Sequence, residues 1–255
     1  MSATGPNVAL FATCLVDLFR PSVGFSAAIL LEEAGCRVTV PVAQTCCGQP
    51  AYNTGDKTDA ADIARQVITK FADYDYVVAP SGSCAGMIKH HYPQLFADDP
   101  EMAAKAAALS EKTFELMSFL TDVLNVPAIH GRFKGVAAYH DSCSGLRELG
   151  IKRQPRQLLS GIDGLSLEEY DGAETCCGFG GAFCVKYDDV SDKIVSSRLE
   201  ELARTEATHV LGGDMGCLFN LAGKLKREGS TIQVRHAAEV LAGLTENPAI
   251  GETDD

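Results

Sequence analysis

Thr45-Cys46-Cys47-Gly48 and Thr175-Cys176-Cys177-Gly178 are the two stretches around which this sequence is organised. Each places two adjacent thiols before a glycine, and each pair has one further cysteine on either side. The flanking residues are Cys14 and Cys84 for the first pair and Cys143 and Cys217 for the second. Matching cysteines are offset by 129, 130 and 133 residues from one half to the other. This near-constant offset indicates an internal duplication.

The duplication predicts two domains in tandem. A chain of 255 residues is long enough for two domains of ordinary size. Pro127 and Gly131 suggest the boundary, because proline and glycine punctuate regular structure. We therefore expect a first cysteine-rich repeat over residues 1–130 and a second over residues 131–255, the latter ending in a loose acidic tail over 246–255.

Short apolar runs alternate with helical patterns in both halves. In the first half we expect strands at 7–13, 36–41 and 75–80 and helices at 22–34, 59–71, 87–92 and 101–124. In the second half we expect strands at 135–139, 165–170 and 209–212 and helices at 154–160, 191–204, 219–228 and 235–244. This alternation predicts the α/β class, with two Rossmann-like domains built on parallel sheets.

The eight matched cysteines are predicted to converge. In parallel α/β sheets, ligands gather in the loops beyond the carboxyl ends of the strands, and the cysteines of each half fall in such loops. The set predicted to bind a metal or cofactor comprises Cys14, Cys46, Cys47 and Cys84 in the first half and Cys143, Cys176, Cys177 and Cys217 in the second. Thiols gathered from distant positions are typical of a metal site.

The spacing favours iron–sulfur clusters. Structural zinc sites usually collect thiolates through local C-x-x-C hooks, and no such hook occurs in the sequence. Adjacent cysteines point in different directions, which suits a polynuclear centre with separate irons better than one tetrahedral ion. We expect one 4Fe-4S cluster in each half. Zinc in one or both halves remains the alternative.

Composition narrows the classes of partner. The formal net charge is −12 and the sequence shows no basic stripe, so nucleic acid is not an expected partner. The apolar stretch 8–19 is interrupted by Asp17 and is too short to span a bilayer, so we expect no transmembrane segment. Ten cysteines without a secretory leader indicate a reducing compartment, and we expect a cytoplasmic protein.

Four segments carry a family resemblance: 140–150, 176–181, 212–217 and 223–230. With the two Cys-Cys-Gly units, they resemble the cysteine-rich CCG domains found in heterodisulfide reductase and in the iron–sulfur subunits of glycolate and glycerol-3-phosphate oxidoreductases. The resemblance is closest to the lactate utilisation protein A type. It implies an electron-transfer subunit that works with other subunits of a complex oxidising L-lactate to pyruvate. Whether this chain is itself the enzyme is left open.

The sequence departs from the family at one point in each half. The full CCG motif ends in C-x-x-C and so supplies five cysteines, which hold non-cubane clusters in heterodisulfide reductase. Met87 and Asn220 stand at that last position here. The resemblance therefore implies four thiolates in each half, enough for an ordinary 4Fe-4S cluster, and does not extend to the heterodisulfide reaction.

The remaining candidates are treated one by one. Cys36 opens a predicted strand and has no matching partner, so core packing is expected. Cys184 lies in a glycine-rich loop near Cys177, and we favour core packing there too. His140 could bond a cluster sulfur or relay a proton, although its counterpart in the first half is Phe11. No catalytic residue is assigned.

Two other functions are compatible with the sequence. A zinc-stapled scaffold or assembly protein would use the same cysteines without redox activity. A thiol–disulfide protein would use the adjacent pairs themselves, which can close into strained rings.

Overall fold

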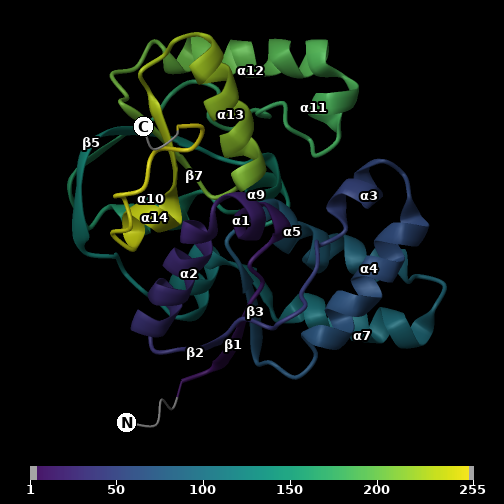
Figure 1. Cartoon of the computed structure of the whole chain (residues 1–255). Helices are drawn as coiled ribbons and strands as arrows, with labels where there is room; N and C mark the ends of the chain where they lie inside the picture. The colour runs from purple at the N-terminus through teal and green to yellow at the C-terminus, as the bar shows by residue number, and fades with distance from the viewer. Residues whose placement is uncertain (1–4, 253–255) are drawn as a thin grey trace. The chain divides into compact units, whose positions relative to one another are not determined.

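The computed structural model describes residues 5–252 and divides into two compact units, residues 1–126 and 127–255 (Figure 1). Each unit contains one four-stranded parallel sheet. The strand order is β2-β1-β3-β4 in the first unit and β6-β5-β7-β8 in the second, so the two sheets have the same topology. The predicted α/β class with tandem parallel-sheet domains is confirmed.

The strands of the first unit are β1 (Asn7–Leu10), β2 (Arg37–Thr39), β3 (Tyr76–Ala79) and β4 (Thr113–Glu115). Its helices are α1 (Cys14–Phe19), α2 (Pro21–Glu33), α3 (Gln49–Asn53), α4 (Lys57–Lys70), α5 (Gly82–Gly86), α6 (Tyr92–Leu95), α7 (Pro100–Glu111) and α8 (Leu116–Ser118). Two π-helical turns complete the unit: η1 (Met87–His91) lies between α5 and α6, and η2 (Phe119–Val123) follows α8. The central strand β1 pairs with β2 and β3, and its last three residues are fully enclosed.

The strands of the second unit are β5 (Gly131–His140), β6 (Ile162–Glu168), β7 (His209–Gly212) and β8 (Gln233–His236). Its helices are α9 (Cys143–Arg147), α10 (Arg153–Leu159), α11 (Phe183–Lys186), α12 (Asp188–Leu202), α13 (Met215–Arg227) and α14 (Ala237–Leu241). Here β5 is the central strand and pairs with β6 and β7. Helices α12 and α13 pack against each other, as Figure 1 shows.

The long amphipathic helices follow the sequence pattern. In α2 the buried apolar residues Val23, Ala27, Leu30 and Leu31 recur at a spacing of three to four, which places them on one face. Pro21 begins the helix, where its missing N–H costs no hydrogen bond. The helix ends just before Gly35, whose φ of 90° suits a glycine.

The last strand of each sheet, β4 and β8, was missed by the sequence patterns. The predicted helix at 101–124 is wrong, because α7 ends at Glu111 and β4 follows. The predicted helix at 235–244 is also wrong at its start, because Arg235 and His236 belong to β8. Strands of three or four residues between helix-forming stretches are too short to display a period of two.

The segment 246–255, predicted as a loose tail, is packed against the second unit for part of its length. Ile250 is buried and its N–H donates a 2.8 Å hydrogen bond to the carbonyl of Val234 in β8. Ala249 is buried as well. The chain is therefore packed against the second unit as far as Ile250, and residues 253–255 of the predicted tail lie outside the described residues.

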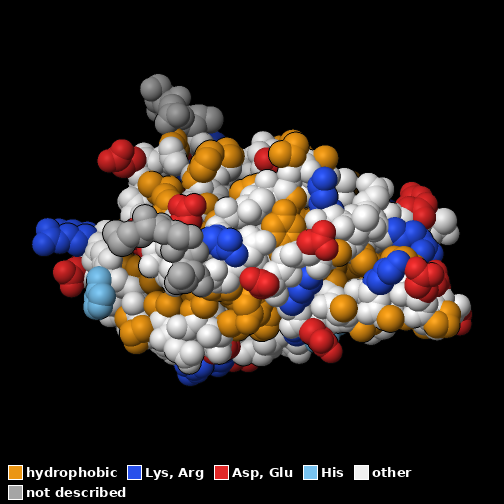
Figure 2. Space-filling view, turned by 90° about the horizontal axis from the view of Figure 1, so that it is seen from below, with side chains coloured by type: hydrophobic (Ala, Val, Ile, Leu, Met, Phe, Trp, Pro, Cys, Tyr) orange, Lys and Arg blue, Asp and Glu red, His pale blue; other side chains and the backbone are white. Residues whose placement is uncertain are grey.

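Two observations concern the kinds of partner considered above: the distribution of charged side chains on the surface and the length of the helices. On the face shown in Figure 2, Lys and Arg side chains are interspersed with Asp and Glu and do not gather in one basic stripe. Among residues 5–252, no helix combines the length and apolarity needed to cross a bilayer.

Candidate metal centres

The first four predicted ligands are brought together in the first unit. Cys14 begins α1 after strand β1, and Cys84 lies in α5 after strand β3. Cys46 and Cys47 lie in the irregular segment that follows β2. The Sγ atoms of Cys14 and Cys46 are 3.7 Å apart. The thiol of Cys47 hydrogen-bonds with those of Cys46 and Cys84, so the four sulfurs form one continuous chain.

The second unit repeats this arrangement. Cys143 begins α9 after β5, and Cys217 lies in the first turn of α13 after β7. The thiol of Cys176 hydrogen-bonds with those of Cys143 and Cys177, and Cys177 continues the chain to Cys217. The structure therefore assembles all eight predicted cysteines as two sets of four. In both sets the outermost two cysteines sit at the starts of helices, not in open loops.

Each set has a buried end and a more open end. Cys47, Cys84, Cys177 and Cys217 are buried, whereas Cys14, Cys46, Cys143 and Cys176 are half-buried. In the first unit, Cys14 and Cys46 line a cleft of about 390 Å³. A metal centre held by either set would therefore be shielded on one side and reachable from the other.

The thiols of one set do not hold protons equally. Hydrogen bonds from Cys14 and Cys47 lower the pKa of Cys46, and hydrogen bonds from Cys143 and Cys177 lower the pKa of Cys176. The pKa of Cys177 is raised, first by its hydrogen bonds to Cys176 and Cys217 and then by burial. Each unit thus favours one thiolate at its half-buried end, the charge state needed to begin metal binding.

In each Cys-Cys-Gly motif, the backbone N–H of the glycine points toward the sulfur of the first cysteine. The N–H of Gly48 donates to Sγ of Cys46 at 3.4 Å, and the N–H of Gly178 donates to Sγ of Cys176 at 3.3 Å. These glycines have φ values of 82° and 86°, a region that side chains rarely adopt. The requirement for glycine is therefore conformational, and its result is a hydrogen bond to a ligand sulfur.

Sequence reasoning missed two side chains that hold the cysteine pairs in place. The phenol of Tyr92 donates to the carbonyl of Cys47 at 2.8 Å, and Nδ2 of Asn220 donates to the carbonyl of Cys177 at 2.8 Å. Asn220 stands where the family's fifth cysteine would be, and Met87 at the equivalent place is buried in the core. The sequence analysis identified Asn220 only as the residue that stands in place of a cysteine. No sequence pattern indicated a role for Tyr92.

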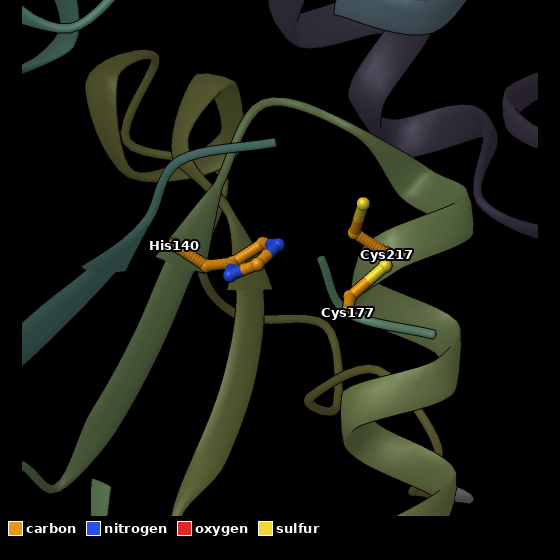
Figure 3. A group of neighbouring side chains, drawn as sticks. All are labelled: His140, Cys177 and Cys217. Atoms are coloured by element: carbon orange, nitrogen blue, oxygen red, sulfur yellow. The ribbon is translucent and has the colours of Figure 1, made fainter. Parts of the chain in front are cut away.

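His140 lies beside the second set. It is the last residue of β5, is only 1% exposed, and its ring points toward Cys177 and Cys217 (Figure 3). A ring nitrogen of His140 and the Sγ atoms of Cys177 and Cys217 all lie within 4.8 Å of one another. Burial, reinforced by the nearby Arg198 guanidinium, lowers the pKa of His140 to about 4. The imidazole is therefore neutral at physiological pH, the form that binds metals.

The two unmatched cysteines differ from each other. Cys36 is buried beside β2, as expected for core packing. Cys184 is half-buried, so the core position expected for it is wrong. Its thiol donates to the carbonyl of Gly181 at 3.4 Å and lines a cleft of about 760 Å³ that Asn220 also borders. The short helix α11 turns the side chain toward this cleft and away from the hydrophobic core.

Two α/β units that each gather four thiols beyond the ends of parallel strands define a cysteine-rich protein of the metal-binding class. The CCG family, described as a cysteine-rich domain, matches residues 8–89 and 137–222, one match in each unit. Lactate utilization protein A from Geobacillus kaustophilus is 48% identical over 92% of this chain and 98% of its own length. Lactate utilization protein A 2 from Bacillus cereus is 44% identical, with the same coverage. The chain belongs to the lactate utilization protein A family, which is built from two CCG domains.

One solved structure shares the fold. A hypothetical protein from Helicobacter pylori superposes with a TM-score of 0.67 and 12% sequence identity, over 98% of this chain and 50% of that one. At this identity the likeness concerns the fold alone. The paired α/β architecture therefore also occurs within a longer chain.

Proposed function

We propose that this chain is an electron-transfer subunit that binds one iron–sulfur cluster in each unit through its four cysteines. The observation that carries the proposal is the matched pair of sulfur chains, Cys14-Cys46-Cys47-Cys84 and Cys143-Cys176-Cys177-Cys217. Four thiolates are the usual ligand set of a 4Fe-4S cluster.

The donor groups present fit such a cluster. Each set of four cysteines supplies soft sulfur ligands from three separate segments, and the adjacent pair contributes two of them in different directions. Backbone N–H groups of Gly48 and Gly178 already point at the sulfurs, as they do around bound clusters. When bound, an iron–sulfur cluster accepts and releases single electrons.

The chain's own residues would set how readily those electrons move. Burial of Cys47 and Cys177 keeps water away from one side of each centre, and N–H···S hydrogen bonds stabilise the more negative, reduced form. The half-buried thiols Cys14 and Cys143 leave the other side near the surface, where electrons can pass to a partner.

The reaction served by this transfer is proposed from the family. Relatives with 44–48% identity are named lactate utilization proteins, so we propose that the chain serves the oxidation of L-lactate to pyruvate, together with further subunits in the cytoplasm. That oxidation releases two electrons, and two one-electron centres in one chain could carry them in succession.

Anaerobic purification followed by metal and sulfide analysis tests the proposal. We expect a brown protein with about four irons and about four sulfides in each unit, bleached by dithionite. A colourless protein with zinc and no iron would instead support a zinc-stapled scaffold. A metal-free protein that changes mass with redox state would support thiol–disulfide chemistry at the cysteine pairs.

A further inference from the structure

His140 is a buried polar side chain without a partner. Neither of its ring nitrogens makes a hydrogen bond to any part of the chain that the structure describes. A buried, unsatisfied donor or acceptor costs roughly 1–3 kcal/mol, so it calls for an explanation, and a bound ion is one. One of its ring nitrogens lies within 4.8 Å of the sulfurs of Cys177 and Cys217 (Figure 3).

The internal repeat provides a direct comparison. His140 lies three residues before Cys143, and Phe11 lies three residues before Cys14. Phe11 is fully buried and packs on Phe71, with ring centroids 5.4 Å apart. The first unit therefore fills this position with an apolar ring, and packing alone does not require an imidazole there.

A second position differs in the same way. The backbone oxygen of Ala60 in α4 lies beside Gly48, and that of Ser191 in α12 lies beside Gly178. Ala60 and Ser191 are therefore equivalent positions, so each residue of α12 corresponds to the residue of α4 that is 131 positions earlier. This offset pairs Arg198 with Val67, and both are buried. The second unit thus replaces two apolar core residues, at the Phe11 and Val67 positions, by two polar ones.

Arg198 brings a positive charge into this buried region. Its Nε and Nη1 atoms make no hydrogen bond within residues 5–252, and its guanidinium lies 5.9 Å from the ring of Tyr170. A buried cation is stable only when negative charge lies close by. Thiolates bound to a metal next to His140 would supply that charge.

We propose that His140 supplies a nitrogen ligand to the metal centre of the second unit, next to the sulfurs of Cys177 and Cys217, whereas the centre of the first unit has sulfur ligands only. This inference rests on the proposed function in requiring a metal in the second unit. The imidazole enters neutral and loses no proton, while the thiols release theirs on binding. The two centres are then chemically unequal although their cysteines match.

Protein labelled with ¹⁵N-histidine tests the assignment. After partial reduction of the anaerobically purified full chain, pulsed electron paramagnetic resonance should detect the strong hyperfine coupling of a directly bound nitrogen. The coupling should be lost in His140→Phe and retained in the matched control His209→Gln, whose ring packs on Phe133 away from the cysteines. His140→Phe introduces the residue that the first unit already accommodates, and circular dichroism checks that it folds.

The outcomes separate the two proposals. Iron in both units with only weak nitrogen coupling, or with coupling that persists in His140→Phe, overturns the ligand assignment and leaves the iron–sulfur function standing. Protein without metal in either unit overturns both. If the second unit holds zinc, X-ray absorption at the zinc edge replaces the resonance measurement, and the absence of an imidazole signal overturns the assignment.

Discussion

The phenolic O–H of Tyr92 donates a 2.8 Å hydrogen bond to the backbone carbonyl of Cys47. Tyr92 is fully buried, and its bond joins helix α6 to the Cys-Cys-Gly segment. In the second unit Asn220 makes the equivalent bond to Cys177 from α13. Two unrelated side chains thus perform one task, which is to fix the carbonyl of the second cysteine in each pair.

Tyr92→Phe removes this bond without changing the volume of the ring. We expect the free energy of unfolding to fall by about 1–3 kcal/mol, because the carbonyl of Cys47 is left buried without a donor. Chemical denaturation of the anaerobic protein measures the change. Tyr187→Phe is the control, since Tyr187 is 59% exposed, and it should leave the midpoint unchanged. Equal effects of the two variants would contradict the role given to Tyr92.

Cys47→Ser should remove about half of the bound iron. Cys47 lies between Cys46 and Cys84 in the first set, so its loss should prevent the first unit from holding its cluster. Cys36→Ser should leave the iron content unchanged, since Cys36 is buried and its pKa is raised by burial, with no other cysteine among the causes. Iron analysis of the two variants, purified side by side, decides the matter. Loss of iron from Cys36→Ser would show that the ligand assignment is wrong.

Gly178→Ala and Gly48→Ala should differ in severity. Both glycines have a positive φ, which costs an alanine about 1 kcal/mol or more. A Cβ at Gly178 would lie 2.8 Å from the backbone oxygen of Ser191, whereas the nearest contact at Gly48 is 3.4 Å, to the side chain of Ile63. We therefore expect Gly178→Ala to lower the melting temperature more than Gly48→Ala. The reverse order would contradict the geometry.

Arg156 binds two carboxylates near the second centre. Its Nη1 and Nη2 atoms each donate to Asp141 at 2.8 Å, and Nε donates to Glu169 at 2.5 Å. Asp141 is buried, so Arg156→Met leaves its charge without a partner. We expect this variant to lose about 3 kcal/mol of unfolding free energy in denaturant titrations. Arg156→Lys should recover only part of the loss, since a lysine cannot reproduce the two-pronged contact.

The pH dependence of stability should report on Glu169. Its hydrogen bond to Arg156 lowers the pKa of Glu169 below the ordinary value of 4.5. A lowered folded-state pKa gives a stabilisation that is present above the unfolded-state pKa and is lost as the pH falls through the folded-state value. The difference in unfolding free energy between the wild type and Glu169→Gln should therefore be largest near neutral pH. It should shrink below about pH 4.5. A constant difference across this range would exclude the ion pair as its source.

Much of this protein could be predicted from its sequence. The duplication, the α/β class and the eight converging cysteines followed from spacing, because strand and helix patterns are local and cysteines after parallel strands must meet at one edge. Helices α2, α4, α12 and α13 were located to within a few residues, whereas the helix that contains α7 was predicted to run on to residue 124. Strands β4 and β8 escaped detection because each adjoins stretches with a helical pattern, and only the pairing of β4 with β3 and of β8 with β7 defines them.

Only the tertiary structure shows how the residues of each site differ from one another. Which thiol is buried, which carbonyl Tyr92 and Asn220 reach, and which cleft Cys184 faces depend on contacts between residues far apart in the chain. Position-by-position comparison of the repeats already identified His140 against Phe11 in the sequence. Pairing Arg198 with Val67 needed the packing of α4 and α12. The sequence by itself thus determined two matched sets of four cysteines, and only the fold decided that their surroundings differ, because burial and charge are properties of a packed neighbourhood and not of a spacing.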